Sequence, residues 1–320
     1  MTTNLPAPVP TLPAAIAELG EDAARAFIDY FTAEIRNANT RAAYARAVGR
    51  FLRWASEHQL GLHQVEPHHV AAYVEQLGRP APVGAGYAPA TIRQHLSALK
   101  MLGGFLVIRQ VLTRNPASEV RPPRHVVRTG KTPVLEGGDA RRLFESIEGD
   151  GPAAARDRAL LGTMVYTFAR VSAVLALDVE DYFQVGRRMV FRFTEKGGRH
   201  HEMPAHHTLI EYMDAYLSAS RASTGPLFRT IDRRRTGFTE NRLRRNEALA
   251  MVKRRCRAAC LGDRFTNHTL RATGITAYLQ NGGQLEHAQY MAAHASPRTT
   301  KLYDRRAQVA SLDEVERIIL

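Results

Sequence analysis

The first third of the chain places its apolar residues three to four positions apart, the spacing of helices that bury one face. Four helices are predicted there, at residues 22–35, 37–59, 67–77 and 90–107. The clearest apolar stripes are Phe27, Ile28, Phe31 and Ile35 in the first helix and Tyr44, Val48, Phe51 and Leu52 in the second. Asn39 or Thr40 is the expected cap of the second helix. The pattern therefore predicts a four-helix N-terminal domain, with a turn-rich loop, GRPAPVGAGYAP, between its last two helices.

The rest of the chain is also mainly helical by its spacing, with one β interruption. In MVFRFTEKGGRHHEMP, Val190 and Arg192 alternate with Phe191 and Phe193, and a Gly-Gly pair follows as a turn. This alternation predicts a hairpin. We therefore expect a mainly α fold with a small antiparallel β hairpin or sheet, divided into two domains.

Composition marks the boundaries between the parts. The start of the chain, which includes PAPVPTLPA, is proline-rich and is expected to be disordered. Pro122 and Pro123 forbid a helix in RPPRHVVRTGK, which holds four basic residues and no acid. We interpret it as an extended linker that is either solvated or in contact with phosphates. The predicted division is a tail at 1–19, a helical domain at 20–120, the basic linker at 121–131, a larger domain at 132–310 and a C-terminal helix at 311–320.

Charge narrows the class of partner. The chain has 44 Lys and Arg against 31 Asp and Glu, a formal net charge of +13, which favours nucleic acid or an anionic membrane surface. No run approaches the roughly 18 apolar residues of a membrane span, and the N-terminus lacks a signal-peptide pattern. Residues 233–257 hold ten Lys and Arg against Glu240 and Glu247. A solvated helix face would explain that run, but we favour a face that binds a nucleic-acid backbone.

Cysteine and histidine spacing argues against a metal site. Cys256 and Cys260, the two cysteines, stand four residues apart on one predicted helix, which excludes a disulfide framework and fits a reducing cytosol. No second Cys pair or His pair has zinc-finger spacing, so no metal is expected. A further cluster without fixed ligand spacing is interpreted as solvated histidines: His200, His201, His206 and His207.

One tyrosine near the C-terminus stands in a cationic stretch, HASPRTTKLYDRR, at residues 294–306. Either the ring of Tyr303 packs on an apolar surface while its neighbours face water, or the cations mark where an anion binds and the phenol meets it. Basic residues elsewhere support the second interpretation. Arg170 ends an apolar helix, Lys196 sits at the hairpin turn, and His268 and Arg271 are spaced to share a helix face.

Taken in order, these residues resemble the C-terminal signature of the tyrosine recombinase (phage integrase) family, which reads Arg, Lys, His-x-x-Arg, His or Trp, then Tyr. The matching positions are Arg170, Lys196, His268, Arg271, His294 and Tyr303. EKGGRHHEMP resembles the family's Gly-Lys-Gly hairpin, AHASPRTTKLYDR its nucleophile segment, and NTRAAYARAVGRFLRW its core-binding domain. The layout is most similar to the Xer-type and integrase-like members. Two positions depart from the pattern: Ala173 replaces a common acidic residue, and Ala293 replaces the usual glycine.

The resemblance implies a clamp around duplex DNA, formed by a helical SAM-like core-binding domain and a tyrosine recombinase catalytic domain. It implies that Tyr303 is a nucleophile that forms a 3′-phosphotyrosyl link and releases a 5′-hydroxyl. Arg170 and Arg271 would hold the two non-bridging oxygens. The expected roles of the others are proton acceptor or phosphate orienter for His268, hydrogen bond to a non-bridging oxygen for His294, and general acid for Lys196. Neither a metal nor ATP nor another cofactor is implied.

The implied partners are double-stranded DNA, further copies of the chain, four of them in a synapse, and accessory DNA-bending or directionality proteins. The expected location is the cytoplasm, at the nucleoid. Candidate DNA-binding residues are Arg41, Arg93, Arg121, Arg124, Arg128, Lys131, Arg244, Arg245 and Lys253. Two alternatives stay open, a type IB topoisomerase-like enzyme that relaxes DNA and a non-catalytic DNA-binding regulator with the same fold.

The C-terminal SLDEVERIIL predicts a short helix, because Ser311 and Glu314 are spaced as a capping box and four apolar residues share one face. Ten residues do not hold a helix unaided, so that face must dock. It docks either on its own domain or, as the resemblance implies, on a neighbouring subunit.

Overall fold

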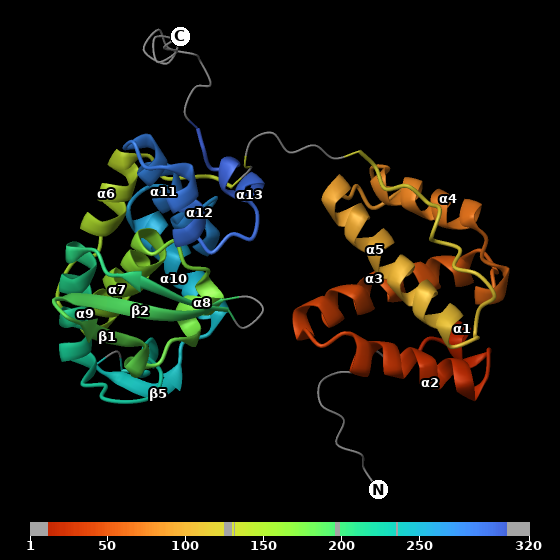
Figure 1. Cartoon of the computed structure of the whole chain (residues 1–320), viewed down its shortest axis with the longest axis horizontal. Helices are drawn as coiled ribbons and strands as arrows, with labels where there is room; N and C mark the ends of the chain where they lie inside the picture. Colours follow the sequence, from red (N-terminus) through yellow and green to blue (C-terminus); the bar gives the residue numbers. More distant parts are fainter. Residues whose placement is uncertain (1–11, 125–129, 131, 196–198, 235, 306–320) are drawn as a thin grey trace, which may run out of the picture. The chain divides into compact units, whose positions relative to one another are not determined.

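The chain divides into two compact units, residues 1–126 and 127–320, and the division falls inside the predicted linker. The computed structural model describes residues 12–124, 130, 132–195, 199–234 and 236–305 (Figure 1). No described helix is both long enough and apolar enough to cross a membrane.

Every described element of regular secondary structure in the N-terminal unit is a helix. Its elements are α1 (Ala14–Ala17), α2 (Glu21–Asp29), the π-helical turn η1 (Tyr30–Glu34), α3 (Ala38–Glu57), η2 (Leu62–Gln64), α4 (Pro67–Gly78) and α5 (Pro89–Ile108). All four predicted helices form, the first as α2 continued by η1. The predicted stripes face the core, where Phe27, Phe31, Val48, Phe51 and Leu52 are buried.

Two details of this unit differ from the expectation. The cap of α3 is Asn37, whose Oδ1 accepts from the backbone N–H groups of Asn39 and Thr40 at 3.0 and 3.1 Å. The cap therefore lies two to three residues earlier than predicted. Residues 14–17, assigned to the disordered tail, form α1, because Ile16 finds a fully buried place in the core of the unit.

The C-terminal unit surrounds a small sheet with helices. Its elements are α6 (Gly137–Glu145), α7 (Pro152–Tyr166), α8 (Val171–Ala176), η3 (Val179–Asp181), β1 (Tyr182–Val185), β2 (Arg188–Glu195), β3 (Arg199–Pro204), α9 (His207–Ser220), β4 (Arg229–Ile231), β5 (Phe238–Arg242), α10 (Arg245–Ala258), α11 (Asn267–Gln280), α12 (Leu285–Met291) and α13 (Pro297–Lys301). Figure 1 shows α11, α12 and α13 grouped at one end of the unit, away from β5.

The predicted hairpin is β2 paired with β3, and the antiparallel sheet has the order β1-β2-β3. Phe191 and Phe193 of β2 are fully buried, as the alternation predicted. The structure also contains β1 and a separate pair, β4 and β5, which the apolar pattern did not predict. These strands are short, and β5, which reads FTENR, lies inside the basic run and lacks a simple apolar alternation.

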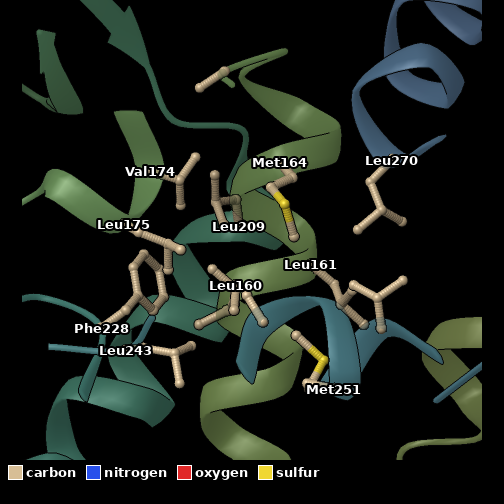
Figure 2. Packing of buried hydrophobic residues seen from close by; sticks show 14 of the residues in the cluster. Leu160, Leu161, Met164, Val174, Leu175, Leu209, Phe228, Leu243, Met251 and Leu270 are labelled. Atoms are coloured by element: carbon tan, nitrogen blue, oxygen red, sulfur yellow. The ribbon is translucent and has the colours of Figure 1, made fainter. Parts of the chain in front are cut away.

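Helix α7 forms the centre of the core. Leu160, Leu161 and Met164 lie between residues from α8, α9, α10 and α11 (Figure 2). The buried carboxylate of Asp157, also on α7, ties this helix to α10. It accepts from Arg156 at 2.8 Å, from Arg254 at 3.1 Å and from Arg255 at 2.9 Å. A buried carboxylate held by several guanidinium groups is costly to disrupt, so this cluster fixes α10 on the core.

The basic run at 233–257 is therefore not one backbone-binding face. Besides Arg254 and Arg255, Arg242 donates to the carbonyls of Leu175 and Leu177 at 2.8 Å, and Arg257 pairs with Asp263 at 3.1 Å. Arg242, Arg254 and Arg255 bind groups distant in sequence, and Arg257 binds an acid six residues further along the chain.

The cysteine and histidine interpretations also change. Cys256 is buried in α10, but Cys260 lies beyond the end of that helix and is exposed. His201 is not solvated, because it is 6% exposed and its Nε2 lies 3.2 Å from the carbonyl oxygen of Met291.

Candidate active site

Helix α11 carries two of the six signature residues and is buried over most of its length. Its first turn is stabilised by Thr269, whose Oγ1 accepts from the N–H of Thr266 at 3.0 Å. Gly274 lets the helix approach α7, because a Cβ at this position would lie 2.0 Å from the carbonyl oxygen of Val165. His268 and Arg271, three residues apart, project from the same face as predicted.

The guanidinium of Arg271 is 1% exposed and is held by backbone carbonyls. Nη1 donates to the carbonyl of Phe168, and Nη2 donates to the carbonyl of Ala292 at 2.6 Å. Both carbonyls belong to segments remote from α11 in sequence. A buried cation needs such partners, because an unsatisfied charge in the core is strongly destabilising.

His294 is fixed by partners on both ring nitrogens. Its Nε2 lies 2.7 Å from Arg271 Nη2, and its Nδ1 lies 2.9 Å from Thr300 Oγ1. An arginine only donates, so Nε2 must be the acceptor and Nδ1–H must donate to the threonine. Burial, and after it the charges of Arg271 and Arg170, lower the pKa of His294 to about 3. The imidazole is therefore neutral at pH 7.

Tyr303 combines both interpretations of the sequence. Tyr303 is 9% exposed and belongs to a buried apolar cluster with Phe168, Ile275 and Ala288. Its ring is stacked on that of His294 with 5.8 Å between ring centroids. Its hydroxyl lies 3.0 Å from His268 Nε2. The phenol is thus an apolar ring whose polar end meets a histidine beside Arg271.

His268 is exposed on one side, yet its pKa is lowered. Desolvation of the ring is the main cause, followed by the charges of Arg271, Arg170 and Arg245. A neutral imidazole has an acceptor nitrogen for the phenol proton. The arrangement can therefore take a proton from Tyr303.

A pocket of about 440 Å³ adjoins these residues. It is lined by Arg170, the cap of α8, by Arg245, the first residue of α10, and by His268 and Arg271. The sequence predicted that Arg170 ends the apolar helix α7. In the structure α7 ends at Tyr166, and Arg170 directly precedes α8. Three guanidinium groups and the N-terminal turns of α10 and α11 make the pocket suited to an anion such as a phosphate.

The two departures from the family pattern have structural counterparts. Ala173 is 4% exposed and brings no carboxylate, and the carbonyls of Phe168 and Ala292 brace Arg271. Ala293 has φ +46°, in the left-handed region. That conformation explains why glycine suits this position, since alanine there is strained.

The candidates for DNA contact fall into different environments. Nε and Nη2 of Arg41 donate to the carbonyl of Ile35 at 3.1 and 2.9 Å, and Nζ of Lys253 donates to the carbonyl of Asp263 at 3.1 Å. Arg245 lines the pocket. The remaining described candidates, all exposed, are Arg93, Arg121, Arg124 and Arg244. Arg128, Lys131, Lys196 and the helix predicted at 311–320 lie outside the described residues.

The N-terminal unit has a basic hollow that was not predicted from the sequence. Arg46, Arg50 and Arg53 of α3, all exposed, line a hollow of about 1050 Å³ together with Thr91 and Gln94 of α5. Their spacing of four and three residues is that of one helix face and was a usable signal. In the C-terminal unit the sequence analysis did not predict Asn267, a pocket residue whose buried Oδ1 has no hydrogen-bond partner among the described residues.

Comparison with known proteins gives the same assignment over most of the chain. The profile of the phage integrase family matches residues 133–309, and that of the phage integrase N-terminal SAM-like domain matches residues 25–110. The tyrosine recombinase XerD of Mycobacterium leprae (strain TN) is 28% identical over 288 residues, 87% of this chain and 90% of the relative. The tyrosine recombinase XerC 1 of Ralstonia nicotianae is 26% identical over 280 residues, 83% of each chain.

Solved structures share the fold. The XerH site-specific recombinase bound to a palindromic difH substrate superposes with a TM-score of 0.69 at 16% identity, over 95% of this chain and 88% of that one. A lambda integrase tetramer bound to a Holliday junction gives 0.67 at 17% identity, over 89% and 78% of the two chains. Because the family profile covers more than half of the sequence, this chain belongs to the phage integrase family, the enzymes known as tyrosine recombinases.

Proposed function

We propose that this enzyme is a site-specific DNA recombinase that cleaves and rejoins DNA strands through a covalent link between Tyr303 and a 3′-phosphate. The observation that supports the proposal most strongly is the hydrogen bond of 3.0 Å between the Tyr303 hydroxyl and His268 Nε2, beside the buried guanidinium of Arg271. It joins a nucleophile, a proton acceptor and an anion-binding group in one place.

In the proposed reaction the Tyr303 oxygen attacks phosphorus and its proton passes to His268. The new bond joins that oxygen to phosphorus, and the bond from phosphorus to the 5′ oxygen breaks. The leaving oxygen takes a proton, and the family resemblance implies that Lys196 donates it. One ester replaces another, so a 5′-hydroxyl from a different strand can reverse the step and rejoin the DNA without an external energy source.

Arg271 and Arg170 are proposed to hold the non-bridging oxygens and to stabilise the charge that builds up in the transition state. Arg271 Nη2 donates to the neutral His294 at 2.7 Å. A phosphate oxygen is a charged and therefore stronger acceptor than an imidazole nitrogen. On substrate binding Nη2 is expected to share this hydrogen bond with the phosphate. His294 donates its Nδ1–H to Thr300 and carries no proton on Nε2, so the hydrogen bond to a non-bridging oxygen that the family resemblance implies requires a proton to move to Nε2.

Duplex DNA and other copies of the chain are the proposed partners. The fold is shared with XerH on its difH substrate and with a lambda integrase tetramer on a Holliday junction. We propose the same kind of assembly here, four protomers on two duplexes. A chain lacking residues 311–320 should then lose cooperative assembly on DNA if that segment docks on a neighbour.

The test is covalent capture. Purified protein is incubated with a randomised library of nicked duplexes, and DNA that stays bound through SDS is sequenced. A recombinase selects a short site, which is then tested for strand exchange between two labelled duplexes. A topoisomerase would relax supercoiled plasmids that lack the site, and a non-catalytic regulator would capture no DNA; either result contradicts the proposal.

A further inference from the structure

The two peptide groups that flank the Cα of Tyr303 are each held from a distant part of the unit. Gly130 N–H donates to the carbonyl of Leu302 at 2.9 Å, and Thr276 Oγ1 donates to the carbonyl of Tyr303 itself at 3.1 Å. Peptide groups are planar, so the orientation of these two planes sets φ and ψ of Tyr303. Those angles in turn fix the direction in which the phenol leaves the backbone.

The tyrosine has little support from its own helix. α13 ends at Lys301, and the Tyr303 N–H reaches back to the carbonyl of Thr300 at 2.9 Å. The short helix has five residues, too few to be stable alone. The position of the nucleophile therefore depends on contacts that come from outside the segment.

Thr276 supplies one of these contacts from α11. Its side chain is buried at 3% exposure, two turns beyond His268 and just over one turn beyond Arg271. A single rigid helix thereby carries the proton acceptor, the buried guanidinium and the donor that holds the tyrosine backbone. Thr276 can keep the phenol at a constant distance from its proton acceptor, His268, and from the guanidinium that is proposed to bind the phosphate.

Gly130 supplies the other contact from the chain that leads into the C-terminal unit. A Cβ at this position would lie 2.7 Å from the Leu302 carbonyl oxygen, so the hydrogen bond at 2.9 Å needs glycine. Thr132 continues the contact, because its carbonyl accepts from Arg305 Nη2 at 2.9 Å. The N–H of Leu135 donates to Thr273 Oγ1 at 2.9 Å, which fastens the chain at Leu135 to α11.

We infer that Thr276 and Gly130 are positioning residues for strand cleavage, which act by fixing the backbone on both sides of the nucleophile. The inference rests on the proposed function of Tyr303. Neither residue lines the anion pocket, so neither is expected to affect DNA affinity. If the two contacts served only to hold the fold, their loss would lower thermal stability and leave the chemical step unchanged in the folded fraction.

The experiment measures the single-turnover rate of covalent adduct formation on a nicked duplex carrying the captured site. Thr276→Val keeps the shape and removes the donor, and Gly130→Ala keeps the N–H but pushes Leu302 away. Each is expected to lower the rate about 10- to 100-fold, because small misplacements of a reacting group cost that much. The matched controls are Thr276→Ser, which keeps the hydroxyl and should restore most of the rate, and Gly137→Ala, where an added Cβ meets nothing within 4 Å.

A second substrate separates nucleophile positioning from leaving-group protonation. In a duplex with sulfur at the 5′ bridging position the leaving thiolate needs no proton. The Thr276→Val and Gly130→Ala defects should persist on it, whereas a defect in the general acid would be suppressed. Melting temperature and DNA affinity are measured for every variant.

Four outcomes decide the inference. Unchanged rates in both variants, rescue by the sulfur substrate, or a loss of rate that only parallels a loss of folded protein would each overturn it. A slower rate in folded, DNA-bound variants that persists with sulfur supports it. Wild type and Tyr303→Phe run alongside, because a wild type that forms no adduct refutes the proposed function, not the positioning.

Discussion

Arg271 Nη2 donates a hydrogen bond to His294 Nε2 at 2.7 Å, and this contact defines the charge state of the histidine. The histidine can only be the acceptor, so it is neutral, and its other nitrogen is committed to Thr300. The cation is therefore held rigidly by the protein before any phosphate arrives. Such preorganisation lets the charge act without rearrangement during the reaction.

Arg271→Lys should lower the rate of strand cleavage by about 10²–10³-fold, the usual cost of removing a group that stabilises the transition state. A single ammonium cannot reach the carbonyls of Phe168 and Ala292 and the phosphate together. Single-turnover cleavage of a nicked duplex measures the effect. Arg187→Lys, on the exposed turn between β1 and β2, is the control and should cleave at the wild-type rate; equal loss in both would contradict this role.

The pH dependence of cleavage should report His268. Cleavage needs the neutral imidazole, and the pKa of His268 is lowered by desolvation and by Arg271, Arg170 and Arg245. The rate should therefore rise to its plateau below the ordinary histidine pKa of about 6.5. His268→Ala should lower the plateau rate by about 10²–10⁴-fold and remove the rise of the rate with pH. A wild-type rise centred above pH 7, or a rise that persists in His268→Ala, would exclude His268 as the acceptor.

The stability of the protein should depend on His294 at acid pH. Its pKa is lowered to about 3 in the folded state, so below pH 6.5 the unfolded chain binds a proton that the folded chain excludes. The free energy of unfolding is therefore highest above pH 6.5. It falls as the pH drops from 6.5 towards 3, by at most about 1.4 kcal/mol per pH unit. Urea unfolding of wild type and His294→Gln at several pH values checks this, and parallel curves would contradict it.

Ala293→Gly should stabilise the fold by about 0.5–1 kcal/mol. Ala293 has φ +46°, where an L side chain costs about 1–2 kcal/mol, partly offset by the greater freedom of glycine when unfolded. The midpoint of thermal unfolding should rise. Ala295→Gly, two residues on and without a positive φ, should lower it.

The sequence predicts the chemical groups of the site better than the way they are held. The cleavage proposed here uses guanidinium, imidazole and phenol groups, and these residue types could be recognised in order along the chain. The braces are backbone carbonyls of Phe168 and Ala292, which every residue type provides, so no pattern marks them.

The elements of the fold likewise differ in how well the sequence predicts them. The apolar spacing was sufficient for the four N-terminal helices and for the β2–β3 hairpin, because burial alone selects those residues. It was insufficient for β4 and β5, whose polar residues are fixed by tertiary partners. The basic run showed the same limit, since the carboxylate that holds Arg254 and Arg255 is Asp157, nearly one hundred positions away in the chain.

The most direct test identifies the amino acid that carries the DNA. After reaction with a nicked duplex of the captured site, the adduct is digested with nuclease and trypsin and sequenced by mass spectrometry. The account predicts a nucleotide on the peptide Leu302–Arg305, whose one tyrosine is Tyr303, and no adduct in Tyr303→Phe. A nucleotide on any other of the 11 tyrosines, or an adduct that survives in Tyr303→Phe, would contradict it.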